Sequence, residues 1–174
     1  SKVQVTRHYF LMFDTDSDDS ISCVSGFIPG VMGSTGIETA DLIASAVKIA
    51  KPEIIIAVDA LAARNVSRIS TTLQISDTGI SPGAGAGNIR KELSEKTLGA
   101  KVIAIGVPTV IDSKTLILDS MAEFLDDPVG AENFINENGV EMIVTTTDID
   151  QIIKDFSDVI ADGINITLHP GIYS

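Results

Sequence analysis

The sequence predicts an α/β fold, and three observations carry that prediction. Short runs rich in β-branched residues alternate with segments of helical periodicity. The runs are apolar throughout, which is typical of strands buried on both faces of a parallel sheet. No repeat, linker or long low-complexity block divides the 174 residues. We therefore expect one domain over residues 1–174, with a mostly parallel twisted sheet and helices on both faces.

The individual elements follow from local patterns. Strands are predicted at 20–28, 53–58, 69–75, 101–107 and 140–145, each bounded by turn formers. A helix is predicted over 35–50, where Thr35 and Glu38 have the spacing of a capping box, and another over 147–161. Shorter helical patterns follow at 60–64, 88–98 and 115–125.

Charge and composition exclude several classes of function. There are 24 acidic and 12 basic residues, so a net charge of -12 repels phosphate backbones and argues against nucleic-acid partners. The apolar runs are far shorter than the roughly 20 residues of a membrane helix. A single cysteine, Cys23, cannot form an internal disulfide, which fits a reducing compartment as well as a secreted chain without bridges, and we expect a cytoplasmic protein. We expect neither a nucleic-acid nor a membrane partner.

Asp59 directly follows a predicted strand, and Asp112 ends the strand-like run AIGVPTVID. In a parallel α/β sheet, ligands gather at the carboxyl ends of the strands, where Asp59 would lie. Asp59 is either a functional carboxylate or an N-cap of the 60–64 helix, and position alone does not decide. For Asp112 we favour capping of the next helix. For Arg64 we favour a structural salt bridge over catalysis.

The triplet Asp77, Thr78 and Gly79 has the DTG pattern of ordinary aspartic proteases, whose two aspartates share one proton. Those enzymes are all-β, whereas this chain is predicted to be α/β. A turn stabilised by an Asx-type hydrogen bond is the favoured interpretation.

Glycines alternate in the loop that follows. Gly83, Gly85 and Gly87 could let a ligand approach the backbone, but neither GxGxxG nor a P-loop lysine is present. We expect a tight loop facing a substrate, and an anion site is the alternative.

Metal and nucleophile motifs are incomplete. Asp14, Asp16 and Asp18 start a calcium-loop pattern, but Asp19 stands where glycine is required. His8, His169 and Cys23 lack the spacing of a zinc site, and there is no GxSxG nucleophile elbow. We expect no metal and no cofactor.

Three strings then carry a family resemblance: VTRHYF (5–10), PGVMGSTGIETADLI (29–43) and the long segment from DALAAR to PTVID (59–112). They closely resemble the germination proteases of spore-forming bacteria, endopeptidases of small acid-soluble spore proteins, and GINITLH (163–169) matches more loosely. The resemblance implies a fold similar to that of hydrogenase maturation proteases. It also implies an atypical aspartic mechanism, in which two carboxylates activate water and the aspartate of the DALAAR motif is Asp59.

The resemblance implies further expectations. The second aspartate lies upstream of VTRH, before Ser1, so we expect this chain to lack the N-terminal segment of the family, including its pro-segment. The loop 76–88 would line a peptide groove, with Asp77, Gly83, Gly85 and Gly87 as substrate-binding residues. Small acid-soluble spore proteins would be cut in the spore core, and we expect a homo-oligomer.

Two alternatives stay open. The chain could be a catalytically incomplete fragment that folds and oligomerises. It could also be a carboxylate metal-binding protease of the maturation type, with Asp59 as a ligand and His169 or His8 as a second candidate.

Overall fold

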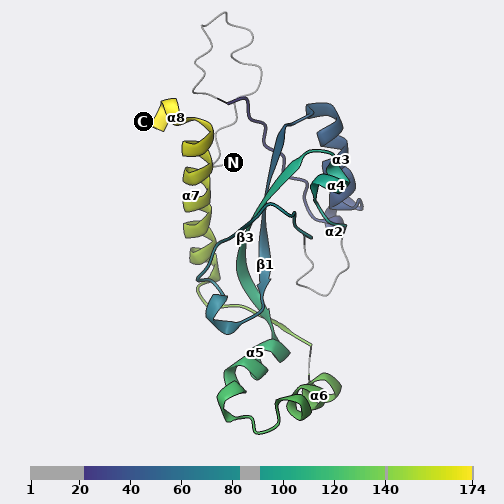
Figure 1. Ribbon diagram of the computed structural model, residues 1–174, viewed down its shortest axis with the longest axis vertical. Helices are drawn as coiled ribbons and strands as arrows, with labels where there is room; N and C mark the ends of the chain where they lie inside the picture. Colours follow the sequence, from purple (N-terminus) through teal and green to yellow (C-terminus); the bar gives the residue numbers. More distant parts are fainter. Residues whose placement is uncertain (1–21, 83–90, 140, 174) are drawn as a thin grey trace, which may run out of the picture. The chain divides into compact units, whose positions relative to one another are not determined.

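The computed structural model describes residues 22–82, 91–139 and 141–173 of the chain (Figure 1). It divides into two compact units, one of Val31–Ile149 and one of Ser1–Gly30 with Asp150–Ser174. Each unit is described by itself below. The number of independently folding domains stays a prediction.

The larger unit is built on a sheet whose core is a long parallel pair (Figure 1). Strand β1 (Ile54–Ala63) pairs with β3 (Lys101–Asp112) along its whole length. Two short strands, β2 (Gln74–Ser76) and β4 (Ile143–Val144), pair with β3 in the antiparallel sense. The α/β class is confirmed, and the sheet is mixed, with a parallel core.

The helices and 3-10 turns of this unit are shorter than the sequence patterns suggest. They are α2 (Met32–Thr35), α3 (Thr39–Ala50), η1 (Val66–Arg68), α4 (Glu95–Leu98), α5 (Ser113–Met121), η3 (Ala122–Phe124) and α6 (Pro128–Asn138).

The predicted helix 35–50 is interrupted at its start. Gly36 adopts a left-handed conformation with φ 68°, which ends α2, and α3 begins at Thr39. The Thr35 hydroxyl donates to the carbonyl oxygen of Val31 at 3.2 Å, so the predicted capping box with Glu38 is wrong.

The predicted helix 60–64 is also wrong, because β1 continues through it. Residues 60–63 pair with β3, and this ladder uses the backbone groups that a helix would need. The intrinsic preference of alanine for helices is therefore overridden by tertiary pairing. The predicted strand 20–28 is wrong as well, since residues 22–28 form no strand.

Two capping aspartates and one capping serine start the later helices. Asp112 Oδ1 accepts hydrogen bonds from the backbone N–H groups of Lys114 at 2.8 Å and Thr115 at 3.1 Å, which confirms its predicted capping role. Asp127 caps α6 in the same way through the N–H of Gly130, at 3.0 Å. Within the predicted helix 88–98, the described part is helical only from Glu95, after the capping residue Ser94.

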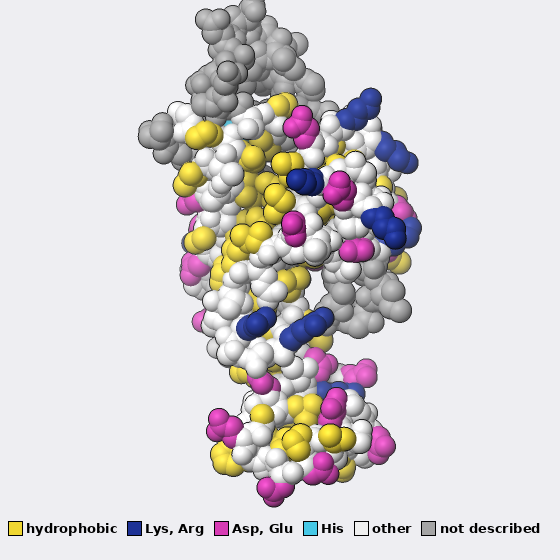
Figure 2. All heavy atoms as spheres, in the orientation of Figure 1, with side chains coloured by type: hydrophobic (Ala, Val, Ile, Leu, Met, Phe, Trp, Pro, Cys, Tyr) yellow, Lys and Arg dark blue, Asp and Glu magenta, His cyan; other side chains and the backbone are white. Residues whose placement is uncertain are grey.

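The buried core follows β3. The most deeply buried apolar side chains of this strand are Val102, Pro108 and Ile111, joined by Ala63 of β1 and Leu93 before α4. Many larger apolar side chains stay exposed, and Figure 2 shows several of them on the surface that it draws. This distribution matters for the surface discussed further below.

In the smaller unit, the described residues form one long helix and a short one. The predicted helix 147–161 is confirmed in type and is longer than expected, as α7 (Ile149–Leu168), followed by α8 (Pro170–Tyr173). The Ser22 N–H donates to the carbonyl oxygen of Leu168 at 3.0 Å, which joins the two chain segments of this unit. Among the described helices, α7 included, none combines the length and the apolarity needed to cross a bilayer.

Candidate active site

Asp59 lies in the interior of β1, not at a strand end as predicted. Its register partner on β3 is Gly106, and Gly106 is also the partner of Gln74 on β2. Residues paired across a sheet point to the same face. The Asp59 carboxylate and the Gln74 carboxamide therefore share one face, with a residue that has no side chain between them.

The Asp59 carboxylate is half-buried, and no other side chain or backbone group of the described residues binds it. No hydrogen bond or ion pair to it occurs there, and its backbone belongs to the β1–β3 ladder. The capping alternative is excluded, because the residues after Asp59 are strand.

An apolar side chain lies beside this carboxylate. Leu61, two residues along β1 and hence on the same face, packs onto Gly106 so closely that a Cβ there would sit 2.6 Å from Leu61 Cγ. A side chain at 106 would therefore displace Leu61 from this position. Leu61 thus covers the backbone of β3 at Gly106, on the face that carries Asp59.

The segment after β1 is held by a residue that sequence reasoning missed. Asp119 of α5 accepts two hydrogen bonds through its two carboxylate oxygens, from Asn65 Nδ2 at 2.8 Å and from the N–H of Val66 at 2.7 Å. Asn65 in turn caps η1 by accepting from the N–H of Ser67 at 2.9 Å. Arg64 is exposed and forms no ion pair with another described residue, so its predicted salt bridge stays a prediction.

The DTG turn is stabilised by a serine, not by the aspartate. The N–H of Thr78 donates to Ser76 Oγ at 3.1 Å, and the hydroxyls of Ser76 and Thr78 lie 2.7 Å apart. Asp77 is exposed and makes no hydrogen bond or ion pair inside the described ranges. The predicted Asx-type bond is therefore wrong, and the Asp77 carboxylate projects from a tight turn.

A two-residue bridge closes the base of the glycine-rich loop. The N–H of Ile80 donates to the carbonyl oxygen of Leu93 at 3.0 Å, and the N–H of Leu93 donates back to that of Ile80 at 2.7 Å. Gly79 has φ 103°, and a Cβ at this position would collide with the Leu93 carbonyl oxygen. The remaining predicted glycines of the loop, Gly83, Gly85 and Gly87, lie outside the described residues.

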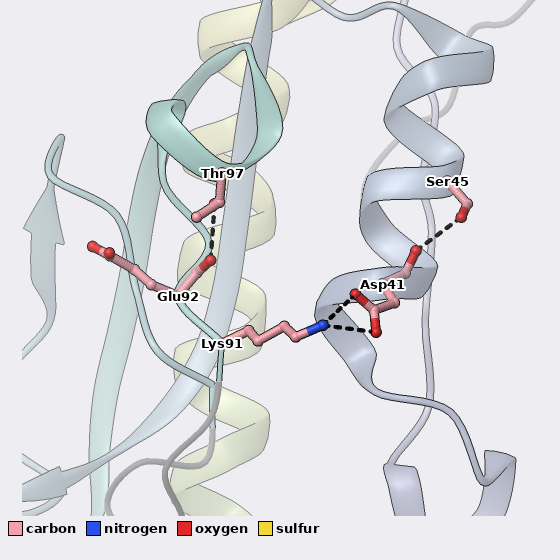
Figure 3. A network of polar contacts seen from close by, with 5 residues as sticks. All are labelled: Asp41, Ser45, Lys91, Glu92 and Thr97. Atoms are coloured by element: carbon pink, nitrogen blue, oxygen red, sulfur yellow. Dashed lines mark hydrogen bonds and ion pairs between the residues drawn. The ribbon is translucent and has the colours of Figure 1, made fainter.

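A charged contact links the chain just before this bridge to α3 (Figure 3). Lys91 Nζ lies 2.8 Å and 3.0 Å from the two carboxylate oxygens of Asp41. The hydrogen bond to Asp41, followed by the charge of that carboxylate, raises the pKa of Lys91 above its usual 10.5. Both side chains are exposed, so the contact positions the segment more than it stabilises the fold.

Metal ligands do not cluster in the described part of the chain. No group of three or more His, Cys, Asp and Glu side chains there could hold an ion. His169 is fully buried after α7, while His8 and the Asp14, Asp16 and Asp18 pattern lie outside the described residues.

Comparison with known proteins decides the family. The model of the germination protease family matches residues 1–138. The chain belongs to the germination protease family. The matched range contains the VTRHYF, PGVMGSTGIETADLI and DALAAR to PTVID strings, whereas the looser tail match at 163–169 falls outside it.

Individual germination proteases show the same likeness. The chain is 43% identical over 192 residues to the germination protease of Clostridium perfringens strain SM101, covering 97% of this chain and 59% of that protein. The values are 42% over 194 residues for Clostridium tetani, with 98% and 60% covered, and 39% over 218 residues for Bacillus velezensis, with 95% and 59% covered. The chain thus spans about 60% of the length of these relatives.

Proposed function

We propose that this germination protease chain acts in peptide-bond hydrolysis, with Asp59 as one of two carboxylates that activate a water molecule. The observation that carries the proposal is the half-buried Asp59 carboxylate, which no hydrogen bond or ion pair occupies in the described structure. A carboxylate used only for structure would be expected to have a partner, as Asp112, Asp119 and Asp127 do.

The proposed reaction needs two carboxylates with different protonation. Like charges placed close together cannot both ionise, so one carboxyl keeps a proton. The ionised member takes a proton from water, the water oxygen attacks the scissile carbonyl, and the protonated member donates to the carbonyl oxygen. Collapse of the tetrahedral intermediate then breaks the C–N bond. The carboxyl group that took the proton from water gives it to the leaving amine, and the other carboxylate takes back the proton that it donated to the carbonyl oxygen. The second carboxylate is proposed to come from the family segment upstream of the VTRHYF motif.

Asp59's neighbours suit this role. Leu61 covers the backbone of Gly106 on the face that carries the carboxylate. The Gln74 carboxamide, on the same face, can donate to and accept from a peptide.

The substrate is proposed to be a protein held in extended form. The loop closed by the Ile80–Leu93 bridge would line the groove, with Asp77, Gly83, Gly85 and Gly87 in contact with the peptide. The family resemblance suggests small acid-soluble spore proteins, cut in the spore core during germination by a homo-oligomer. The chain's net charge of -12 is consistent with an enzyme that acts on a DNA-coating protein without binding the DNA.

The test is Asp59→Asn in the full-length protein, with cleavage of a small acid-soluble spore protein followed by mass spectrometry. Each proton transfer contributes typically 10² to 10⁴ in rate, so kcat should fall at least about 100-fold. Asp162→Asn, which changes an exposed acid of α7 without a partner in the described structure, is the matched control and should leave kcat unchanged.

Circular dichroism should be the same for the wild type and both variants. An active Asp59→Asn enzyme would refute the catalytic role. A wild type that folds and oligomerises but cleaves nothing would instead support the non-catalytic alternative.

A further inference from the structure

Residues 113–141, which we call the helical lobe, contain α5, η3 and α6 and extend beyond the end of β3 (Figure 1). The lobe belongs to the larger compact unit. Its base and its tip differ sharply in how they are packed, and this difference is the starting point of the inference.

The base of the lobe is firmly anchored. Asp112 caps α5, and Asp119 holds the segment after β1 through two short hydrogen bonds. On the returning side, the N–H of Ser113 donates to the Met142 carbonyl oxygen at 2.9 Å, and the N–H of Met142 donates to Ser113 Oγ at 3.2 Å. The lobe therefore has a defined place on the sheet.

The tip of the lobe lacks a core. No residue of α6 is buried, and the one buried residue of α5 is Ser113, at the base. The two helices have 9 and 11 residues, a length at which helices are marginal in water unless an apolar face is covered. The contacts within the lobe therefore leave apolar surface on both helices uncovered.

A continuous apolar stripe is available for such a contact. Ile117, Met121 and Phe124 follow one another at i, i+4 and i+7, which places them along one face of α5 and its 3-10 extension. All three are exposed, Phe124 to 82% of its surface. Val129 and Phe134 of α6 are exposed to 68% and 66%. Figure 2 shows apolar side chains of this lobe surrounded by acidic ones.

The charge of the lobe is unusually negative. It contains seven acidic residues and one basic residue, Lys114, so its formal charge of -6 is half of the chain's -12. Asp119 and Asp127 are engaged in hydrogen bonds, and Glu141 lies 3.8 Å from Lys114. The other four acids are exposed and make no hydrogen bond or ion pair within the described structure: Glu123, Asp126, Glu132 and Glu137.

We propose that the helical lobe is a docking surface for a basic amphipathic polypeptide segment. Apolar side chains of the partner cover Ile117, Met121 and Phe124, and its Lys and Arg side chains pair with the four uncommitted acids. Covering the stripe removes apolar surface from water and supplies the burial that the short helices lack.

Charge decides against other occupants. Nucleic acid and anionic lipid surfaces carry negative charge and are repelled by a lobe of charge -6. A second copy that presented the same lobe would place -6 against -6, which disfavours a symmetric contact. A basic polypeptide is the partner that satisfies both the apolar stripe and its acidic surroundings.

The test uses a fluorescein-labelled helical peptide of 18 residues made of Leu and Lys, with Leu at helical spacing, and the full-length protein. Fluorescence anisotropy should show saturable binding that weakens with salt. A matched peptide with Glu in place of every Lys should not bind. Binding does not depend on cleavage, so this test is independent of the proposed activity.

Variants locate the site. Phe124→Ser and Met121→Ser should each weaken binding at least about 10-fold, since each removes a buried apolar contact at the interface. Changing the four uncommitted acids to Gln or Asn should lower both the affinity and its salt dependence. Ile49→Ser, which alters an equally exposed apolar residue of α3, is the control and should leave affinity unchanged.

Three results would overturn the proposal. The first is equal binding of the basic and acidic peptides, and the second is unchanged affinity in Phe124→Ser. The third is self-association in sedimentation velocity that is lost in Phe124→Ser while the wild type does not bind the basic peptide. That result would assign the lobe to a contact between copies of the chain.

Discussion

Replacing Asp119 by alanine should destabilise the larger unit, because one side chain holds the segment after β1 to α5. Its two carboxylate oxygens accept from Asn65 Nδ2 at 2.8 Å and from the Val66 N–H at 2.7 Å. Both contacts are partly shielded from solvent. Alanine removes the acceptors but leaves two donors that water reaches only in part.

The magnitude follows from these two contacts. A hydrogen bond to a charged group contributes about 1.5–3 kcal/mol, and partial exposure reduces this toward the lower limit. We expect Asp119→Ala to lower the free energy of unfolding by about 2–4 kcal/mol. In Asp119→Asn the side chain keeps one acceptor oxygen and gains an NH2 group. It can therefore accept from the Val66 N–H or from Asn65 Nδ2, but not from both. The loss in this variant should be about half as large.

Urea unfolding followed by circular dichroism measures these changes. With an m-value of about 2 kcal/mol/M, the midpoint for Asp119→Ala should fall by about 1–2 M. Asp126→Ala, which removes an acid with no partner in the described structure, should stay within about 0.5 kcal/mol of the wild type. Equal midpoints for Asp119→Ala and Asp126→Ala would refute the reasoning.

A double-mutant cycle makes the test sharper. Asn65→Ala removes one donor to Asp119 and the cap of η1. If the two side chains interact directly, the double variant should lose less than the sum of the single losses, by about 0.5–3 kcal/mol. Additive losses would show that Asp119 and Asn65 act separately.

Two further predictions concern the base of the glycine-rich loop. Gly79→Ala should cost about 1–3 kcal/mol more than Gly99→Ala in urea unfolding, because both glycines have positive φ but only Gly79 would place its Cβ against the Leu93 carbonyl; equal losses would contradict this. An NMR titration of Lys91 should give a pKa above 10.5 that is lower in Asp41→Asn, because the largest cause of the shift is removed. Since the folded-state pKa is raised, the stabilisation by this contact is complete below pH 10.5 and is lost as the pH rises through the folded-state pKa. An identical pKa in both proteins would exclude the contact in solution.

Local chemistry explains which parts of the fold the sequence could predict. The Asp112 cap was predictable because the donors, Lys114 and Thr115, are two and three residues away. The Asp119 contact was not, because its partners lie 53 and 54 residues earlier in the chain. The DTG turn was also hard to predict, because Ser76 and Asp77 are neighbours and both residue types accept hydrogen bonds from nearby backbone N–H groups. The structure has Ser76 in this role.

The candidate site shows the same limit. The DALAAR motif in the sequence was enough to select Asp59. The apolar run before it, residues 54–58, suggested a strand that ends at the aspartate. The shared face with Gln74 depends on the register of β1, β3 and β2, which local sequence does not specify. Close packing of Leu61 on Gly106 likewise arises only when the two strands pair.

A β-bulge explains how β1 can continue past Asp59 as a strand. Leu61 pairs with Pro108 and Ala62 with Val110, so Thr109 is the extra residue on β3. Proline has no N–H to give to the ladder, and a bulge is where a strand tolerates it. The Pro108 carbonyl oxygen accepts from the Ser70 N–H at 2.7 Å, and that of Thr109 accepts from Thr145 Oγ1 at 2.6 Å.

Both carbonyl groups at the bulge are thus satisfied by segments outside the β1–β3 pair. Ser70 makes its contact from a left-handed conformation, with φ 56°, which is costly for a non-glycine residue. The larger unit therefore contains a strained residue beside β3, the strand that pairs with the Asp59 strand β1. The parallel ladder that sets Asp59 opposite Gly106 runs unbroken from Ile54 to Leu61, and the bulge shifts the register only after this stretch, at the proline.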